Sequence, residues 1–283
     1  MASFTNFATL SYNGGTTNSN IVTGEILEAL TAVKTAVSAN YSAGDRITYA
    51  LSLVNTGTAA ITDYTVTDNL GGYTVGANTV YPLAYNAGTV RYYINGVLQA
   101  APTVTAGPPL TVTGLTVPAG GSAVLIYETT ATPVAPLATG SSITNTATIT
   151  GGGLTTPITA QATVETANSA DLTISKALSP TTVTENGQIT YTFVISNTGN
   201  TEATATGNVV VTDTFAPILR NIAVTYNSTA WTEGTNYTYN AATGVFTTLA
   251  GQITVPAASF TQNTDGTFTV TPGTATLVIT GTV

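Results

Sequence analysis

Two lysines, Lys34 and Lys176, are the only side chains of the sequence that could supply a nucleophilic amine. The chain contains no histidine and no cysteine, which excludes imidazole bases, thiol nucleophiles, zinc fingers and disulfide bonds. A lysine amine becomes nucleophilic when burial lowers its pKa, and a neighbouring carboxyl group can then carry protons. Asp68 and Asp213 are the candidate carboxyl groups. The simpler interpretation is a partly buried Lys–Asp salt bridge.

Both lysines occupy the same position of an internal repeat. Residues 33–57 align with residues 175–199 without a gap, so that Lys34 falls on Lys176 and Asn55 on Asn197. Further along, TVTDNL with Asp68 matches VVTDTF with Asp213. A surface role would scatter two lysines, so their shared position indicates a common function.

The first repeat continues into residues 143–165, which are typical of a closing β-hairpin, whereas no such segment follows the second repeat before Val283. Residues 4–26 match this closing hairpin instead, with Asn6 on Asn145 and Ala8 on Ala147. The sequence therefore predicts a circular permutation. Its N-terminal hairpin would complete a second domain that lacks a closing strand, either in the next molecule or in the same one.

The composition predicts an all-β protein. Hydrophobic residues make up 43% and charged residues 6% of the chain, and alternating runs at residues 46–54 and 188–195 are typical of half-buried strands. Asn95-Gly96 and Asp265-Gly266 predict tight hairpin turns. Residues 25–36 are expected to form a strand and a linker rather than a helix. We expect a donor segment at 1–28, a first domain at 29–168 and a second at 169–283.

The lysine, the NTG turn, the VTD motif and the late TNTAT segment resemble the bacterial surface-repeat family catalogued as domain of unknown function 11. They are also similar to fimbrial and adhesin domains that form internal Lys–Asn isopeptide bonds. This resemblance implies an immunoglobulin-like β-sandwich for each repeat, an extracellular structural or adhesive role, and no cofactor. With the repeat alignment, we expect two tandem immunoglobulin-like β-sandwiches with an N-terminal donor hairpin.

In an isopeptide site, a neutral lysine amine attacks an asparagine carboxamide while an acid shuttles protons and ammonia leaves. For the first domain the candidate residues are Lys34, Asp68 and Asn145. For the second domain Lys176 and Asp213 would meet Asn6 of another subunit. The remaining residues predicted for the donor segment are Phe4, Phe7, Ala8 and Leu10.

These features favour a structural subunit of an extracellular fibre, such as a pilus-like filament or a spore appendage, that assembles head-to-tail with copies of itself. The alternative is a surface adhesin that binds a host protein or a glycan, and a hydrolase using paired carboxylates is the weakest hypothesis. A net charge of −8 argues against nucleic-acid partners. No metal site is expected, because Asp45, Asp63 and Asp68 lack calcium-loop spacing. The sequence shows neither a membrane-spanning stretch nor a signal peptide, and we expect a location on the cell or spore surface or outside the cell.

Overall fold

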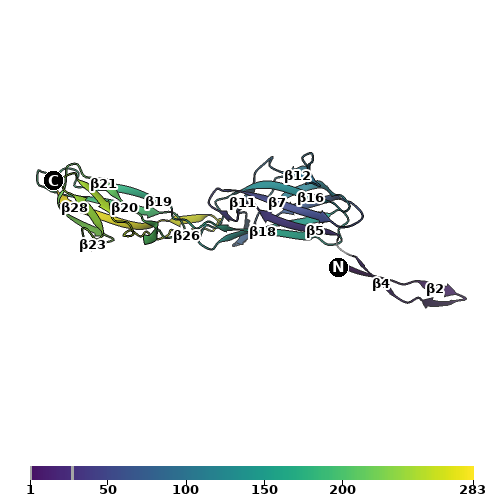
Figure 1. The fold of residues 1–283 in the computed structure, drawn as a ribbon. Helices are drawn as coiled ribbons and strands as arrows, with labels where there is room; N and C mark the ends of the chain where they lie inside the picture. The colour runs from purple at the N-terminus through teal and green to yellow at the C-terminus, as the bar shows by residue number, and fades with distance from the viewer. Residues whose placement is uncertain (1, 27–28) are drawn as a thin grey trace.

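The structure is a computed structural model that describes residues 2–26 and 29–283. Within these residues the chain is built of strands, and its one helical element is a 3₁₀ turn at Ala205–Gly207. The N-terminal hairpin, a first sandwich and a second sandwich follow one another along an extended molecule (Figure 1). The all-β prediction is confirmed. The described part of the chain holds no helix with the length and apolar character to cross a bilayer.

The first sandwich packs two sheets against each other. One sheet has the order β13-β12-β16-β7-β5, with β11 also paired to β16, and the other has the order β14-β15-β8-β17-β18-β6. Their bounds are β5 Leu30–Ala36, β6 Asn40–Tyr41, β7 Arg46–Asn55, β8 Ile61–Asp68, β11 Leu83–Tyr85, β12 Arg91–Ile94, β13 Val97–Leu98, β14 Thr103–Thr105, β15 Leu110–Val117, β16 Ser122–Ala131, β17 Ser142–Gly151 and β18 Ile158–Thr166. A small hairpin, β9 Tyr73–Val75 with β10 Asn78–Val80, extends from the sandwich.

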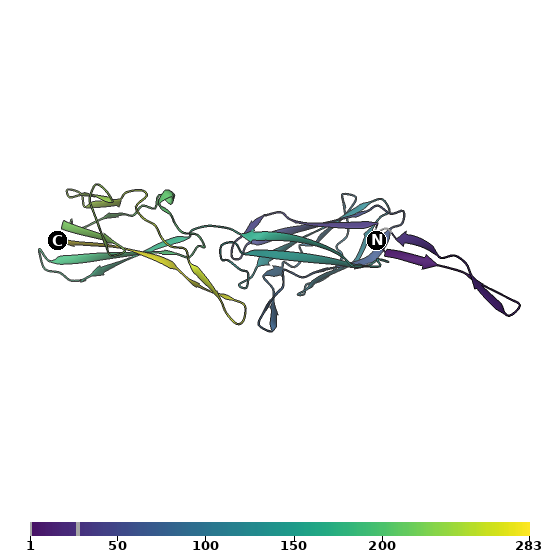
Figure 2. The ribbon, with the colours of Figure 1, turned by 90° about the horizontal axis from the view of Figure 1, so that it is seen from below.

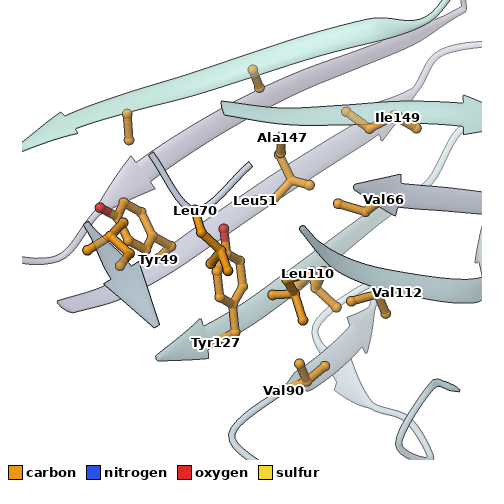
Figure 3. Close-up of a cluster of buried hydrophobic side chains, with 14 of the residues drawn as sticks. Tyr49, Leu51, Val66, Leu70, Val90, Leu110, Val112, Tyr127, Ala147 and Ile149 are labelled. Carbon is orange, nitrogen blue, oxygen red and sulfur yellow. The ribbon is translucent and has the colours of Figure 1, made fainter. Parts of the chain in front are cut away.

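Alternate side chains of these strands point inward and close a core between the sheets. Leu51, Val66, Leu110 and Ile149 are among the buried residues, which come from both sheets (Figure 3). The period of two therefore places one face of each strand in the core, as the alternating runs predict.

The second sandwich has its own core and fewer strands. Its larger sheet has the order β19-β20-β28-β22-β23 and its smaller sheet the order β21-β25-β24. The bounds are β19 Leu172–Ser179, β20 Gln188–Asn197, β21 Thr212–Thr214, β22 Arg220–Tyr226, β23 Thr229–Trp231, β24 Tyr237–Asn240, β25 Val245–Thr248, β26 Ser259–Gln262, β27 Phe268–Thr271 and β28 Gly273–Thr282. The chain thus forms two tandem immunoglobulin-like β-sandwiches.

The N-terminal hairpin consists of two ladders, β1 Ala2–Asn6 with β4 Val22–Ile26 and β2 Thr9–Tyr12 with β3 Gly15–Asn18. Asn6 lies opposite Val22, whereas the match to β17 and β18 would place it opposite Thr23. Among the described residues no further strand pairs with this hairpin to fix its register, which explains a slip of one position. Residues 25–26 and 30–36 are strand and Ala29 is not, as expected for a strand and a linker, and residues 27–28 lie outside the described residues.

One of the two predicted turns differs in detail. Asn95 and Gly96 have positive φ and join β12 to β13 as a two-residue turn. Asp265 and Gly266 lie instead in a wider loop, which Asn263 closes by donating its N–H to the carbonyl oxygen of Thr267 at 2.8 Å. The Asp265 side chain accepts hydrogen bonds from Thr267, which favours this wider form over the two-residue turn.

Hydrogen bonds tie the two sandwiches end to end. The Asn200 side chain donates from Nδ2 to the carbonyl oxygens of Leu137 and Ala167 at 3.0 and 2.9 Å. The β26–β27 hairpin reaches back to the first sandwich, where Gln262 donates to the Tyr73 hydroxyl at 2.9 Å. The N-terminal hairpin projects from the other end of the first sandwich. It therefore lies far from the second sandwich in both views (Figures 1 and 2).

The NTG motif of each repeat has a structural explanation. The Asn197 side chain is fully buried, donates to the carbonyl oxygens of Thr201 and Pro256, and accepts from the N–H groups of Asp171 and Gly199. Asn55 makes the equivalent contacts to Gly57 and Pro118 in the first sandwich. One carboxamide thus closes the end of each sandwich.

We expect Asn197→Ala to lower the free energy of unfolding of the second sandwich by about 2 to 3 kcal/mol, because several backbone groups lose their partner. Trp231, the single tryptophan of the chain, lies in this sandwich and reports its unfolding in urea by fluorescence. Asn78→Ala, at an exposed position of the first sandwich, is the control and should change stability by less than about 0.5 kcal/mol. Equal unfolding midpoints for the two variants would contradict this role of Asn197.

Candidate functional site

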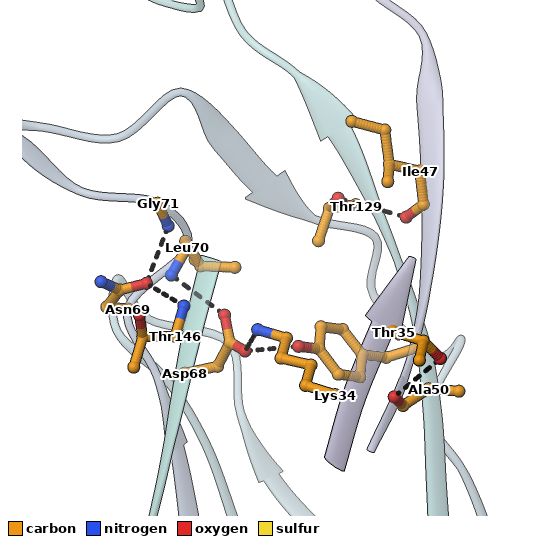
Figure 4. A network of polar contacts seen from close by, with 11 residues as sticks. Lys34, Thr35, Ile47, Ala50, Asp68, Asn69, Leu70, Gly71, Thr129 and Thr146 are labelled. Carbon is orange, nitrogen blue, oxygen red and sulfur yellow. Dashed lines mark hydrogen bonds and ion pairs between the residues drawn. The ribbon is translucent and has the colours of Figure 1, made fainter. Parts of the chain in front are cut away.

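Lys34 and Asp68 form an ion pair inside the first sandwich. Lys34 Nζ lies 2.5 Å from Asp68 Oδ2, and the relative exposures of the two side chains are 0% and 1%. Asp68 Oδ2 also accepts a hydrogen bond from the Tyr127 hydroxyl, and Oδ1 accepts one from the N–H of Leu70 at 3.0 Å. Figure 4 shows the carboxylate held between the lysine and the Leu70 amide. The sequence predicted this pair.

Burial changes the chemistry of the lysine. It lowers the pKa of Lys34 from 10.5 to about 8, while the adjacent Asp68 carboxylate opposes that shift. The amine also lies 4.8 and 5.8 Å from the ring centroids of Tyr49 and Tyr127. Burial therefore favours the neutral amine, which is the form that attacks a carbonyl carbon.

Asn145 lies in the same core. Its side chain is fully buried on β17, and its two polar atoms have no hydrogen-bond partner among the described residues. The carboxamide adjoins the hydroxyls of Tyr49 and Tyr127, the same two tyrosines that border Lys34. An unpaired buried carboxamide is costly and rare, and a role in a reaction is one explanation for it.

Lys176 and Asp213 form the matching ion pair in the second sandwich, but in a different environment. Lys176 is 40% exposed and Asp213 is 18% exposed. The amine lies over the Tyr191 ring, 4.4 Å from its centroid, and within 5.5 Å of the Phe215 centroid. The two lysines occupy equivalent positions of the repeat, and each pairs with an aspartate, but they differ in burial.

The cause of this difference is a missing strand. In the first sandwich, β17 pairs with β8 so that Ala147 lies opposite Asp68, and β18 lies against β5 beside Lys34. In the second sandwich, β21 pairs with β25 on one edge, and no described residue pairs with its other edge. Side chains of β19 that should face a core are left exposed, including Ile174 at 54% and Leu178 at 38%.

The predicted donor residues lie on the hairpin and bury little of their surface. Phe4, Phe7 and Leu10 are 53%, 54% and 60% exposed, and Ala8 and Asn6 are exposed as well. The hairpin that carries Asn6 lies at the opposite end of the molecule from the second sandwich, which carries Lys176 and Asp213 (Figure 2). Within one chain the structure does not bring the second set of predicted residues together.

The tyrosines that surround the first site were not predicted from the sequence. Tyr49 and Tyr127 lie opposite each other on β7 and β16, and their rings stack with centroids 5.8 Å apart. The alignment of the repeats places Tyr49 on Tyr191. That match was the sequence feature that could have pointed to Tyr49 as part of the site. The contact between Tyr127 and Asp68 joins strands far apart in sequence and only the fold creates it.

No protein-family model matches the chain, so its resemblance to the surface-repeat family stays a prediction, and no curated protein matches it. Solved structures similar to it include BcpA, the major pilin subunit of Bacillus cereus, with 14% identity over 96% of this chain and 73% of that chain and a TM-score of 0.35. The full-length major pilin RrgB from Streptococcus pneumoniae has 12% identity over 89% of this chain and 44% of that chain, with a TM-score of 0.36.

The N-terminal domain of the Streptococcus gordonii adhesin Sgo0707 has 14% identity over 47% of this chain and 31% of that chain, with a TM-score of 0.35. The chain thus spans less than a third of the adhesin structure and less than half of RrgB. Likenesses this distant assign no function.

The two ion pairs should differ in their contribution to stability. In an Asn145→Ala background, we expect Asp68→Ala to destabilise the first sandwich by about 3 to 5 kcal/mol, because it leaves a buried amine without its partner. Asp213→Ala should cost less than about 1 kcal/mol, because solvent screens the half-exposed pair. Thermal unfolding followed by circular dichroism measures both. A larger loss for Asp213→Ala than for Asp68→Ala would overturn this ranking.

Proposed function

We propose that the chain is a structural subunit of an extracellular fibre, and that each subunit donates its N-terminal hairpin to the second sandwich of the next. The observation that supports this most strongly is the exposed inner face of β19 beside the unpaired edge of β21. An apolar slot next to an open strand edge binds a further strand through main-chain hydrogen bonds and buried side chains.

The hairpin carries the side chains that such a slot requires. Its alternate residues Phe4, Asn6, Ala8 and Leu10 align with Ile143, Asn145, Ala147 and Ile149, which are the buried stripe of β17. Both stripes have three apolar residues and one asparagine at the same position. The hairpin therefore presents to a neighbour the pattern that β17 presents to the core of the first sandwich.

The same alignment predicts the register of the docked strand. Ala147 lies opposite Asp68 on β8, so Ala8 should lie opposite Asp213 on β21. Asn6 would then hold, next to Lys176, the place that Asn145 holds in the first sandwich. Because donor and acceptor lie at opposite ends of the molecule, the contact is head-to-tail and generates an open filament.

Covalent bonds would lock both sites. In the first sandwich the neutral Lys34 amine attacks the Asn145 side-chain carbon, a C–N bond forms, and the Asn145 amide nitrogen leaves as ammonia. The protonated Asp68 carboxyl group gives its proton to the leaving nitrogen and takes one from the attacking nitrogen, so the reaction needs no other reactant. Lys176, Asp213 and Asn6 of the next subunit would react in the same way after docking.

The first bond should depend on pH in a defined manner. The reactive form of the pair holds one proton, on the carboxyl group, and a neutral amine. Above about pH 8, the pKa of Lys34, the ion pair loses its last proton, and the rate should fall about tenfold per pH unit because no acid remains for the leaving ammonia. Chains made by cell-free translation and transferred to buffers from pH 7 to 10 would show the loss of one ammonia, about 17 Da, by intact mass.

Asn145→Ala and Lys34→Met are the controls for that experiment and should keep the unmodified mass at the first site. A wild-type chain that never loses ammonia would rule out this bond. A rate that keeps rising above pH 8 would show that Asp68 does not act as the acid.

The docking itself can be tested with two variants that each lack half of the second site. Lys176→Ala keeps the donor Asn6, and Asn6→Ala keeps the acceptor Lys176. Refolded separately, each variant should give only monomers after boiling in detergent. Refolded together, they should give a covalent dimer of twice the monomer mass, because one intact donor meets one intact acceptor.

If the mixture gives no dimer while the wild-type chain shows a second ammonia loss in a monomer band, the hairpin inserts into its own chain and head-to-tail assembly is wrong. If electron microscopy shows filaments of the wild-type chain and detergent dissolves them, docking is noncovalent.

A further inference from the structure

The core around Asn145 contains a second unpaired polar group. The Tyr49 side chain is fully buried, and its hydroxyl has no hydrogen-bond partner among the described residues. Unpaired buried donors and acceptors cost free energy, and the Tyr49 hydroxyl and both polar atoms of Asn145 lack a partner among the described residues of the first sandwich. An unpaired hydroxyl can donate a hydrogen bond to the carboxamide oxygen if that oxygen gains negative charge and shifts position during a reaction.

The two tyrosines beside Asn145 are engaged differently. Tyr127 already donates its hydroxyl to Asp68, whereas the Tyr49 hydroxyl is uncommitted. Burial raises the pKa of the Tyr49 phenol, as does the nearby Asp68 carboxylate, and the adjacent Asn145 side chain opposes the rise. The phenol therefore stays protonated at neutral pH and can act as a donor.

We propose that Tyr49 is a catalytic residue whose hydroxyl stabilises the oxyanion that forms on Asn145 Oδ1. This inference rests on the proposed Lys34–Asn145 bond. When the Lys34 amine attacks the side-chain carbon of Asn145, the carbonyl π electrons move to Oδ1, and the Tyr49 hydroxyl donates a hydrogen bond to that charge. When ammonia leaves, the carbonyl reforms and Tyr49 keeps its proton. Donors placed for such an oxyanion act most strongly in a dry core.

The second site carries the same group. Tyr49 aligns with Tyr191, which lies under the Lys176 amine, 4.4 Å from nitrogen to ring centroid. Tyr127 has no such counterpart, because the residue paired with Tyr191 across the sheet is Ile279, where Tyr127 is paired with Tyr49. Of the two tyrosines at the first site, Tyr49 is thus the one present in both repeats, and Tyr191 would serve the intersubunit bond.

The test compares two phenylalanine variants that each remove an unpaired buried hydroxyl from the first core. Tyr64 is also fully buried with an unpaired hydroxyl, which makes Tyr64→Phe the matched control. Full-length chains are made by cell-free translation, and loss of ammonia is followed by intact mass over time. We expect Tyr49→Phe to form the Lys34–Asn145 bond about 10² to 10³ times more slowly than wild type, and Tyr64→Phe to match wild type.

Stability separates catalysis from folding. In the Asn145→Ala background, in which this bond cannot form, Tyr49→Phe should unfold at the same temperature as its parent or higher, because it removes an unpaired hydroxyl. A slow reaction in an equally stable variant supports the proposal, and a wild-type rate overturns it. If Tyr49→Phe unfolds at lower temperature and reacts slowly, the effect is structural and the proposal is also rejected. A wild-type chain that never loses ammonia defeats the proposed bond itself.

Discussion

The main differences between the two sandwiches follow from one exposed surface, the inner face of β19 in the second sandwich. In the first sandwich the equivalent strand β5 lies against β18, and its lysine and leucine are buried. A sandwich gains its stability from burying both inner faces, so an exposed stripe beside an open edge is a site that another strand can stabilise. In the proposed assembly, the exposed apolar side chains of the N-terminal hairpin would cover this surface, and burying both in one contact would be favourable.

The same constraint determines what the two lysines can do. Lys34 and Lys176 have the same neighbours in sequence and each pairs with an aspartate. Burial lowers the pKa of Lys34 to about 8, whereas Lys176 remains in contact with water. If a donated strand covers the second site, it would also desolvate Lys176. Docking would then supply both the asparagine and the dry environment, so that cross-linking follows assembly and not the reverse.

The shape of the molecule suits a fibre that carries load. Asn200 and the β26–β27 hairpin connect the two sandwiches end to end, and the donor hairpin projects from the far end of the first sandwich. If the hairpin is the donor and the second sandwich the acceptor, as proposed, each subunit has them at opposite ends. A force along the fibre would cross the hairpin, both sandwiches and the next hairpin, which is where the proposed bonds lie.

The sequence by itself determined the strands, the two repeats, and the pairing of each lysine with its aspartate, because alternation fixes which positions face the core and the repeat alignment puts both pairs at equivalent positions. It also revealed the displaced hairpin through the match of Asn6 to Asn145. Only the tertiary structure decided that Lys34 is buried and Lys176 is not, that Tyr127 reaches Asp68, and that Tyr49 and Asn145 are left unpaired. Burial and these contacts depend on which strands lie on both sides of a residue, and strands distant in sequence supply that covering. Two local details also differed from the prediction. Hydrogen bonds from Thr267 to the Asp265 side chain favour the wider loop. The register of the N-terminal hairpin is not fixed by any further described strand.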